Sequence, residues 1–179
     1  MSEENITVGV LGLGIIGSRV AQNLRDQGWR TFVWNRTPQD HPDVLGSPGE
    51  VAAQASILQV FVRDGEALLS VLDQMAPQLS EEHVVLNHAT VSPEATHEAA
   101  LRVGNAGAAF LDCPFTGSRD AAAAGKLNYY VGGEQAVVEQ VRGVLDASAQ
   151  TVTHLGKIGT ATVLKIATNM ISAATVAIL

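Results

Sequence analysis

Three glycines near the start of this chain restrict its fold more than any other feature of the sequence. Gly12, Gly14 and Gly17 directly follow the apolar run at residues 6–11, and a stretch with helical spacing of apolar side chains covers residues 15–27. An apolar run that leads through such glycines into a helix is typical of a buried strand, a tight turn and a closely packed helix. The segment therefore predicts the first strand and helix of a βαβ unit.

Each glycine of the Gly12-x-Gly14-x-x-Gly17 spacing has a mechanical task. Gly12 makes the tight turn, Gly14 lets the backbone approach a pyrophosphate, and Gly17 lets the helix pack closely on the strand. The first N–H groups of the helix then face the phosphates. The spacing therefore predicts a dinucleotide cofactor that is bound by Gly12, Leu13, Gly14, Ile15 and Ile16. The alternative is a degenerate core of the same fold that has lost its ligand.

The rest of the chain alternates short apolar runs with helix-length stretches, which is the pattern of a parallel sheet covered by helices. Strands are expected at residues 6–11, 30–34, 57–62, 84–87, 108–112, 128–131 and 150–154. Helices are expected at residues 15–27, after a capping box at Ser47 up to residue 54, and at 65–75, 93–103, 134–145 and 159–179. We therefore predict an α/β fold with a Rossmann-like, doubly wound, mostly parallel sheet. Residues 1–157 are expected to form the cofactor-binding domain, and residues 158–179 the start of a long interdomain helix.

The expected second strand ends in Trp34-Asn35-Arg36-Thr37, which contains no carboxylate. A site for NAD usually has an Asp or Glu here, which binds the ribose 2′-hydroxyl. Arg36 instead offers a planar charged group to a 2′-phosphate, and Thr37 adds a hydroxyl. The segment therefore predicts Asn35, Arg36 and Thr37 as cofactor-binding residues and favours NADP over NAD. The alternative is an arginine exposed in a turn.

Lys165 and Asn169 lie four residues apart and so share one face of the expected last helix. The other side chains on that face are small or apolar. An ammonium group in such surroundings can protonate or polarise a carbonyl group, and the amide of Asn169 can orient it or the substrate. Lys165 and Asn169 are therefore the candidate catalytic residues. The alternative is a lysine that is only a solvated surface charge.

Composition and charge argue against several classes of function. The net charge of −7 and the isoelectric point near 5.1 argue against nucleic acid or an anionic membrane as a generic partner, because a binder of phosphate backbones needs a net basic surface. No apolar run is long enough to span a bilayer, and the histidines lack metal-ligand spacing, so no metal site is expected. The lone Cys113, expected to be a buried small residue, and the polar N-terminus without a signal peptide favour the cytoplasm.

The final stretch at residues 171–179 is apolar and uncharged and carries no helix stop signal. Such a helix needs another surface to pack against. We therefore expect either that the chain is a fragment or that a partner covers this helix. We also expect the protein to form a homo-oligomer through it.

Taken together, these motifs are similar to those of the β-hydroxyacid dehydrogenases, whose members include 3-hydroxyisobutyrate dehydrogenase and glyoxylate/succinic semialdehyde reductase. Beyond the glycine motif and Trp34-Asn35-Arg36-Thr37, the resemblance rests on Thr90-Val91-Ser92-Pro93, Leu111-Asp112-Cys113-Pro114-Phe115-Thr116-Gly117-Ser118, Gly125-Lys126-Leu127, Val131-Gly132-Gly133 and Gly159…Lys165…Asn169. The family has a cofactor domain of the 6-phosphogluconate dehydrogenase NAD-binding type, a long linking helix and an all-helical domain. The resemblance implies that this chain stops inside the linking helix and lacks the all-helical domain.

The resemblance also implies roles for matching positions. Lys165 matches the catalytic lysine of the family, and Asn169 its companion amide. Thr116-Gly117-Ser118 matches a Ser-Gly-Gly turn that binds the carboxylate of the substrate. Thr90 matches a threonine near the nicotinamide.

Further positions match less completely. Val62 and Arg63 match residues that wall the cofactor. Asn87-His88-Ala89-Thr90 replaces the Asp-x-Ser-Thr pattern of the family, and Ser118 replaces its second glycine, which leaves the substrate open. His88, two residues before Thr90, is a further candidate for lining the pocket.

The resemblance implies an NADP-preferring oxidoreductase that transfers a hydride between the nicotinamide and a small β-hydroxyacid or its semialdehyde, a small-molecule carboxylate. Imine reductases share the cofactor domain but generally lack the lysine, so an imine reductase-like enzyme is one alternative. A non-catalytic dinucleotide-binding module is another. Because Lys165 lies on a helix that the missing domain is expected to hold, we expect this chain alone to bind cofactor but to turn over poorly.

Overall fold

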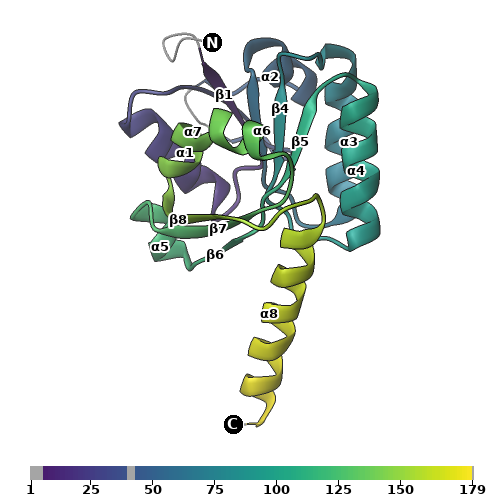
Figure 1. Ribbon diagram of the computed structural model, residues 1–179. Coiled ribbons are helices and arrows are strands. Elements are labelled where there is room, and N and C mark those ends of the chain that lie inside the picture. Colours follow the sequence, from purple (N-terminus) through teal and green to yellow (C-terminus); the bar gives the residue numbers. More distant parts are fainter. Residues whose placement is uncertain (1–5, 40–42, 179) are drawn as a thin grey trace.

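The computed structural model describes residues 6–39 and 43–178, and in it the chain folds around two β-sheets (Figure 1). The larger sheet has five parallel strands in the order β2-β1-β3-β4-β5. Its strands are β1 (Thr7–Leu11), β2 (Arg30–Trp34), β3 (Ile57–Val60), β4 (Val84–Asn87) and β5 (Ala109–Asp112). Every residue of β3 and β4 is buried, which explains why these strands show no alternation of apolar and polar residues and are apolar except for Gln59 and Asn87.

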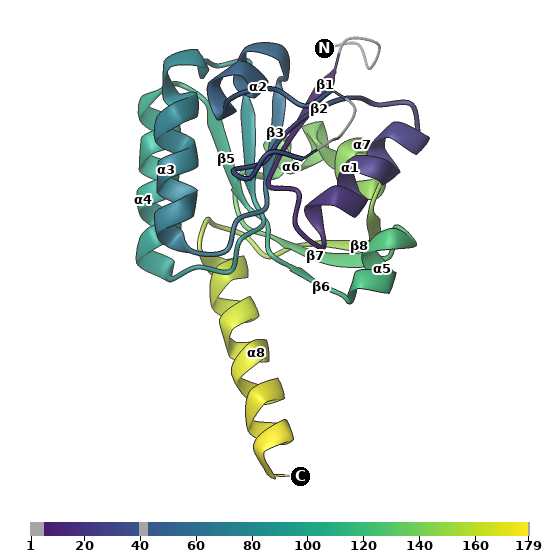
Figure 2. The same ribbon diagram turned by 180° about the vertical axis from the view of Figure 1, so that it is seen from behind.

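Helices cover both faces of this sheet, as Figures 1 and 2 show from opposite sides. One face packs against α2 (Pro48–Gln54), α3 (Gly65–Met75), the 3₁₀ turn η2 (Ala76–Gln78) and α4 (Pro93–Asn105). The other face packs against α1 (Gly17–Asp26), α6 (Gln135–Gln140) and α7 (Arg142–Asp146). The predicted doubly wound α/β class is confirmed.

The local signals in the sequence place several elements accurately. The expected elements at residues 30–34, 84–87 and 65–75 match β2, β4 and α3 residue for residue. The predicted capping box is present, because the hydroxyl of Ser47 accepts the N–H of Glu50 at 3.2 Å. The expected strand at 57–62 ends early, at Val60, because the next two residues leave the sheet to line a cleft.

The last expected strands form a second sheet of their own, in the order β6-β7-β8. It contains β6 (Phe115–Thr116), β7 (Leu127–Val131) and β8 (Ala149–His154), with β6 antiparallel and β8 parallel to β7. The sequence pattern predicted neither β6 nor the following α5 (Arg119–Ala123), because both are too short to show a periodicity. The helix expected at 134–145 is divided into α6 and α7, because the backbone at Val141 leaves the helical range with ψ of 4°.

Helix α8 (Thr160–Ile178) extends away from the two sheets after its first turns (Figure 1). Its start lies close to the predicted boundary at residues 157/158, and the absence of a helical domain from this chain stays a prediction. Within residues 6–39 and 43–178, none of the helices has both the length and the apolar character that crossing a membrane requires.

Candidate active site

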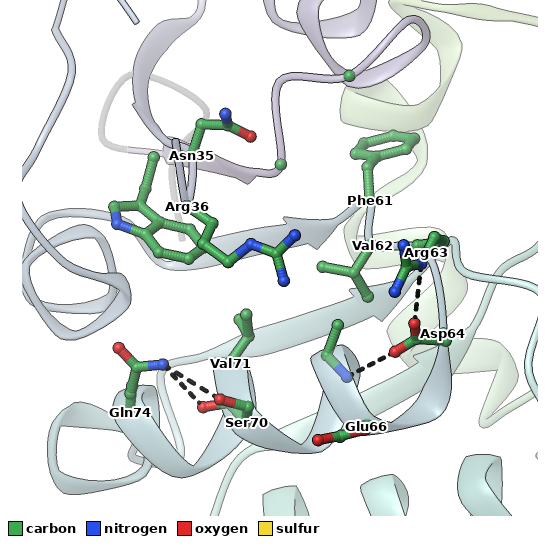
Figure 3. A pocket seen from close by; sticks show the side chains of 14 residues that line it. Asn35, Arg36, Phe61, Val62, Arg63, Asp64, Glu66, Ser70, Val71 and Gln74 are labelled. Carbon is green, nitrogen blue, oxygen red and sulfur yellow. Dashed lines mark hydrogen bonds and ion pairs between the residues drawn. The ribbon is translucent and has the colours of Figure 1, made fainter. Parts of the chain in front are cut away.

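The order of the strands places a cleft at the carboxyl edge of the large sheet. The chain leaves β1 toward α1 on one face and leaves β3 toward α3 on the other, so β1 and β3 form a topological switch point, where open α/β sheets bind ligands. A cleft of about 740 Å³ lies there (Figure 3). It is lined by Gly12, Gly14, residues 34–36, residues 61–64 and, from α3, Glu66, Ala67, Ser70, Val71 and Gln74.

The glycine loop forms one wall of the cleft, and its surroundings require glycine at two of its three positions, Gly12 and Gly17. Gly12 has φ of +102°, and a side chain there would collide with the carbonyl oxygen of Phe61. A side chain at Gly17 would collide with the carbonyl of Gly12, whereas a Cβ at Gly14 would meet nothing within 4 Å. No side chain caps the start of α1, although the N–H groups of Ser18 and Arg19 already donate to the carbonyls of Gly14 and Ile16. The open space at Gly14 lets an anion approach the backbone before them. This loop therefore fits the pyrophosphate of a dinucleotide.

Asn35 holds the glycine loop to the end of β2. Its Oδ1 accepts the N–H of Leu13 at 3.0 Å, and its Nδ2 donates to the carbonyl of Thr37 at 2.8 Å. Leu13 itself is buried in the core, and Ile15 is exposed. Four of the predicted cofactor-binding residues are not among the described residues that line the cleft: Leu13, Ile15, Ile16 and Thr37. Their contact with a cofactor stays a prediction.

Charged side chains of both signs lie along the cleft. Figure 3 shows the exposed Arg36 reaching over the cleft toward Val62. Arg63 forms an ion pair with Asp64 at 3.0 Å. The pKa of Asp64 lies below its usual value because its carboxylate accepts the N–H of Ala67 at the start of α3, and because Arg63 and Arg36 are nearby.

A second group of polar side chains lies where α8 meets the small sheet. The Nζ of Lys165 donates to Oγ1 of Thr116 at 3.0 Å, across 49 positions of sequence. Lys165 is half-buried, and this burial lowers the pKa of its ammonium group. Within the described ranges Lys165 has no ion-pair partner. Asn169 is exposed one turn further along α8, and Thr90 is exposed after β4.

The turn after Thr116 is built tightly. Gly117 has φ of +155°, and a Cβ there would lie 2.6 Å from the side chain of Leu127. The hydroxyl of Ser118 accepts the N–H of Ala121 at 3.1 Å and so caps α5. The turn therefore keeps the Thr116 hydroxyl next to Lys165, while the Ser118 hydroxyl already caps α5.

Asp112 anchors the start of α8 to the large sheet, and the expectation that another domain holds the rest of this helix stays a prediction. The carboxylate is fully buried and accepts the N–H of Gly159 at 3.1 Å, the N–H of Thr162 at 2.8 Å and the hydroxyl of Thr162 at 2.7 Å. The hydroxyl of Thr162 also lies 3.0 Å from that of Thr96 on α4. Lys165 is one helical turn beyond this anchor, so the cofactor domain itself positions it.

Comparison with known proteins now identifies the family. Residues 7–156 match the model for the NAD binding domain of 6-phosphogluconate dehydrogenase. The chain belongs to this family. Over nearly its whole length it is similar to the N-terminal part of β-hydroxyacid dehydrogenases.

Relatives of this NAD-binding domain include named reductases and dehydrogenases. Glyoxylate/succinic semialdehyde reductase 2, chloroplastic, of Arabidopsis thaliana is 28% identical over 93% of this chain and 49% of its own length. The solved structure of Mycobacterium tuberculosis 3-hydroxyisobutyrate dehydrogenase with L-serine superposes with a TM-score of 0.90 at 24% identity, covering 94% of this chain and 60% of its own. The imine reductase of Streptomyces aurantiacus gives 0.84 at 22%, covering 92% and 60%. The chain spans about half the length of the curated relatives it matches.

The sequence prediction for this dehydrogenase domain missed the wall of the cleft that α3 supplies. Ala67, Ser70, Val71 and Gln74 lie on one side of the helix, at the spacing of successive turns. That spacing was visible in the sequence, but the apolar face of α3 that packs into the core gives the stronger signal. His88, considered as a lining residue, is buried behind the cleft, and Cys113 is buried as expected.

We expect Asp112→Asn to destabilise the fold by about 1–3 kcal/mol, because an amide nitrogen cannot accept the N–H groups that the carboxylate accepts. Burial raises the pKa of Asp112 above its ordinary value of 3.8, although the hydrogen bonds from Thr162 and Gly159 lower it. The stability that depends on this group is therefore largest below pH 3.8 and falls as the pH rises through the raised pKa.

The difference in unfolding free energy between wild type and Asp112→Asn should thus decrease from acidic to neutral pH in urea titrations. Asp146→Asn, which affects an exposed partner of Arg142, serves as control. A difference that stays constant over this pH range would contradict the assignment.

Proposed function

We propose that the protein is an NADP-preferring oxidoreductase that transfers a hydride between a nicotinamide and a small β-hydroxyacid or its semialdehyde. The contact between Lys165 and Thr116 carries this proposal, because it places a proton donor in the same domain as the cleft at the topological switch point. The family relation supports it, and the named reductase and dehydrogenase relatives act on substrates of this class.

In the proposed reaction, the cofactor supplies the hydride. Lys165 donates a proton to the carbonyl oxygen during reduction and accepts one from the hydroxyl during oxidation. The backbone N–H groups of the turn at residues 116–118 and the hydroxyl of Thr116 hold the carboxylate of the substrate. Asn169, one turn from Lys165, orients the substrate, and Thr90 lies on the nicotinamide side. Because a proton donor must lie within about 3 Å of its partner, the Asp112 anchor directly serves this step.

Two alternatives differ in what they predict for Lys165. An imine reductase-like enzyme shares the fold but would not depend on a lysine at this position, and a non-catalytic module would bind the dinucleotide without turnover. A panel of glyoxylate, succinic semialdehyde, methylmalonate semialdehyde, tartronate semialdehyde and a cyclic imine, assayed by NADPH oxidation, separates the three. The proposed compartment is the cytoplasm, supported only by composition and by the unpaired, buried Cys113.

Lys165→Met should lower the rate of semialdehyde reduction by about 100-fold or more and leave the NADPH dissociation constant unchanged. Protonated Lys165 is the active form in reduction, and its pKa is lowered by burial. The wild-type rate should therefore fall as pH rises through a value below the ordinary 10.5 of lysine, and the Met variant should lack this limb. Both are measured by loss of NADPH absorbance. An unchanged rate in Lys165→Met would favour one of the alternatives.

Cofactor preference provides a separate test. Arg36 reaches over the cleft, and no carboxylate at the end of β2 opposes a 2′-phosphate. Arg36→Ala should weaken NADPH binding by about 10- to 100-fold and leave NADH nearly unaffected, because a charge-assisted hydrogen bond is lost only with NADPH. Titrations followed by fluorescence measure both constants, with Arg142→Ala on α7 as control. Equal affinities of the wild type for the two cofactors would refute the preference.

We also propose that two copies of the chain associate through α8. Val163, Ala167, Met170 and Ala174 are exposed and spaced four, three and four residues apart, which places them on one face of the helix. Lys165 and Asn169 lie on the opposite face, so this association leaves them free.

Met170→Glu should therefore convert a dimer to a monomer in sedimentation experiments, because a charge would be buried between the helices. Ser172→Glu, on the opposite face, should leave the dimer intact. A wild type that is monomeric at all protein concentrations would disprove the association.

A further inference from the structure

A buried histidine connects the cleft with the Lys165–Thr116 pair. His88 follows β4, is 2% exposed, and makes contacts with its ring face and with both ring nitrogens. Its backbone N–H donates to the carbonyl of Val60 at 3.0 Å, which ties it to the end of β3. It therefore lies between the segments that leave β3 and β5.

The ring of His88 stacks on Phe61, with ring centroids 4.3 Å apart and 13° between the planes. Phe61 lines the cleft, and its carbonyl oxygen is the atom that leaves no room for a side chain at Gly12. Figure 3 shows its ring at the end of the cleft beside the glycine loop. Since stacked rings gain energy beyond burial alone, His88 keeps the Phe61 ring in one orientation at this wall.

The Nδ1 of His88 lies 2.7 Å from the carbonyl oxygen of Cys113. Cys113 follows β5, and two residues separate it from Thr116, the hydrogen-bond partner of Lys165. The N–H of Cys113 donates to the carbonyl of Asn87 at 2.8 Å. The connection from β5 to β6 is therefore held at both backbone groups of Cys113, and His88 supplies one of the two contacts.

The contact with Cys113 also determines the protonation of the ring. A carbonyl oxygen only accepts, so Nδ1 carries the proton and donates. Burial lowers the pKa of His88 to about 3, so the ring is neutral near pH 7 and Nε2 is an acceptor. Nε2 lies 3.0 Å from Oε1 of Gln59, whose buried Nε2 has no partner in the described part of the chain. With the Gln59 amide turned so that its nitrogen faces His88, both groups are satisfied and the tautomer is fixed.

We propose that His88 is a positioning residue with two separable tasks: its ring face holds Phe61 against the cofactor cleft, and its Nδ1–H holds the Cys113 carbonyl so that Thr116 stays in front of Lys165. The proposal rests on the proposed function, since it assigns the cleft to the cofactor and Lys165 to the substrate side. The two tasks use different parts of the imidazole, so substitutions can remove one and keep the other.

His88→Asn removes the ring but keeps a donor near the position of Nδ1, and His88→Phe keeps a stacking ring but removes both hydrogen bonds. We expect His88→Asn to raise the NADPH dissociation constant by about 3- to 10-fold, which is the size of a lost stacking contact. We expect His88→Phe to leave that constant within about twofold of wild type, because the stacked ring remains.

The substrate side is measured without turnover, by mass spectrometry of Lys165 after treatment with an amine-reactive reagent over a range of pH. In His88→Phe the Thr116 strand is released and Lys165 becomes more hydrated, so the midpoint of its labelling should move up toward the ordinary value for lysine. In His88→Asn the midpoint should stay that of the wild type. This crossed pattern cannot arise from a general loss of stability, which would affect both measurements in both variants.

A double-mutant cycle with Phe61→Leu checks that His88 acts on the cofactor through Phe61. If it does, adding His88→Asn to Phe61→Leu raises the NADPH dissociation constant no further than the larger single effect. Effects that multiply, or an unchanged constant in His88→Asn, would overturn the first task. An unshifted labelling midpoint in His88→Phe would overturn the second. If His88→Phe does not fold, the cycle still decides the first task, and His88→Gln, which lacks a donor near Nδ1, replaces it for the second.

These outcomes are separate from failure of the proposed function. A wild type that binds neither NADPH nor NADH would refute the dinucleotide assignment. The labelling midpoints of Lys165 in the wild type and in the two His88 variants would then still report whether His88 controls the Thr116–Lys165 contact.

Discussion

The close approach between the turn after β1 and the carbonyl of Phe61 after β3 is the contact on which the rest of the site depends. It requires positive φ at Gly12 and no side chain at Gly12 or Gly17, because any Cβ would overlap a carbonyl oxygen. The segments that follow β1 and β3 approach each other because these strands are neighbours in the sheet, although α1 and α3 lie on opposite faces. The glycine loop that precedes α1 and one side of α3 consequently face one cleft.

A second constraint is the burial of charge at the end of β5. Removing the Asp112 carboxylate from water is costly, and the start of α8 compensates by aiming the N–H groups of Gly159 and Thr162 at it. The helix therefore begins where the carboxylate requires it, and Lys165 follows one turn later. The net effect of burial is still to raise the pKa of Asp112, so the anchor is obtained at some cost in stability near neutral pH.

Features that depend on neighbouring residues could be predicted from the sequence, and contacts across the fold could not. The glycine spacing, the Ser47 cap and the bounds of α3 are local, and the structure contains all of them. The two-residue β6 and the five-residue α5 leave no periodic signal, and they are stabilised by pairing with β7 and by the Ser118 cap.

The candidate site shows the same division. Lys165 was singled out by its helix face and by resemblance, but its contact with Thr116 joins segments 49 residues apart. Asn35 lines the cleft and stays a predicted cofactor-binding residue, but the sequence did not show that both groups of its amide bond the backbone of residues 13 and 37. The role of Asp112 could not be found because its three donors come from Gly159 and Thr162, at the start of α8, which lie 47 and 50 residues further along the chain.

The small sheet explains how a dinucleotide-binding domain can also shape a substrate site. The five-stranded parallel sheet, with the cleft at its switch point, offers walls for the cofactor. No residue of α8 is among the described residues that line this cleft. The antiparallel β6 turns the chain back after β5 and presents Thr116, while β7 and β8 hold β6 in place. Lys165 is then fixed from two directions, by Asp112 through the helix backbone and by Thr116 at its ammonium group. Because both fixing residues precede α8 in the chain, the position of the Lys165 ammonium group is a property of this domain. The exposed apolar face of α8 lies on the side of the helix opposite Lys165, so the proposed association of two copies through it leaves this geometry unchanged.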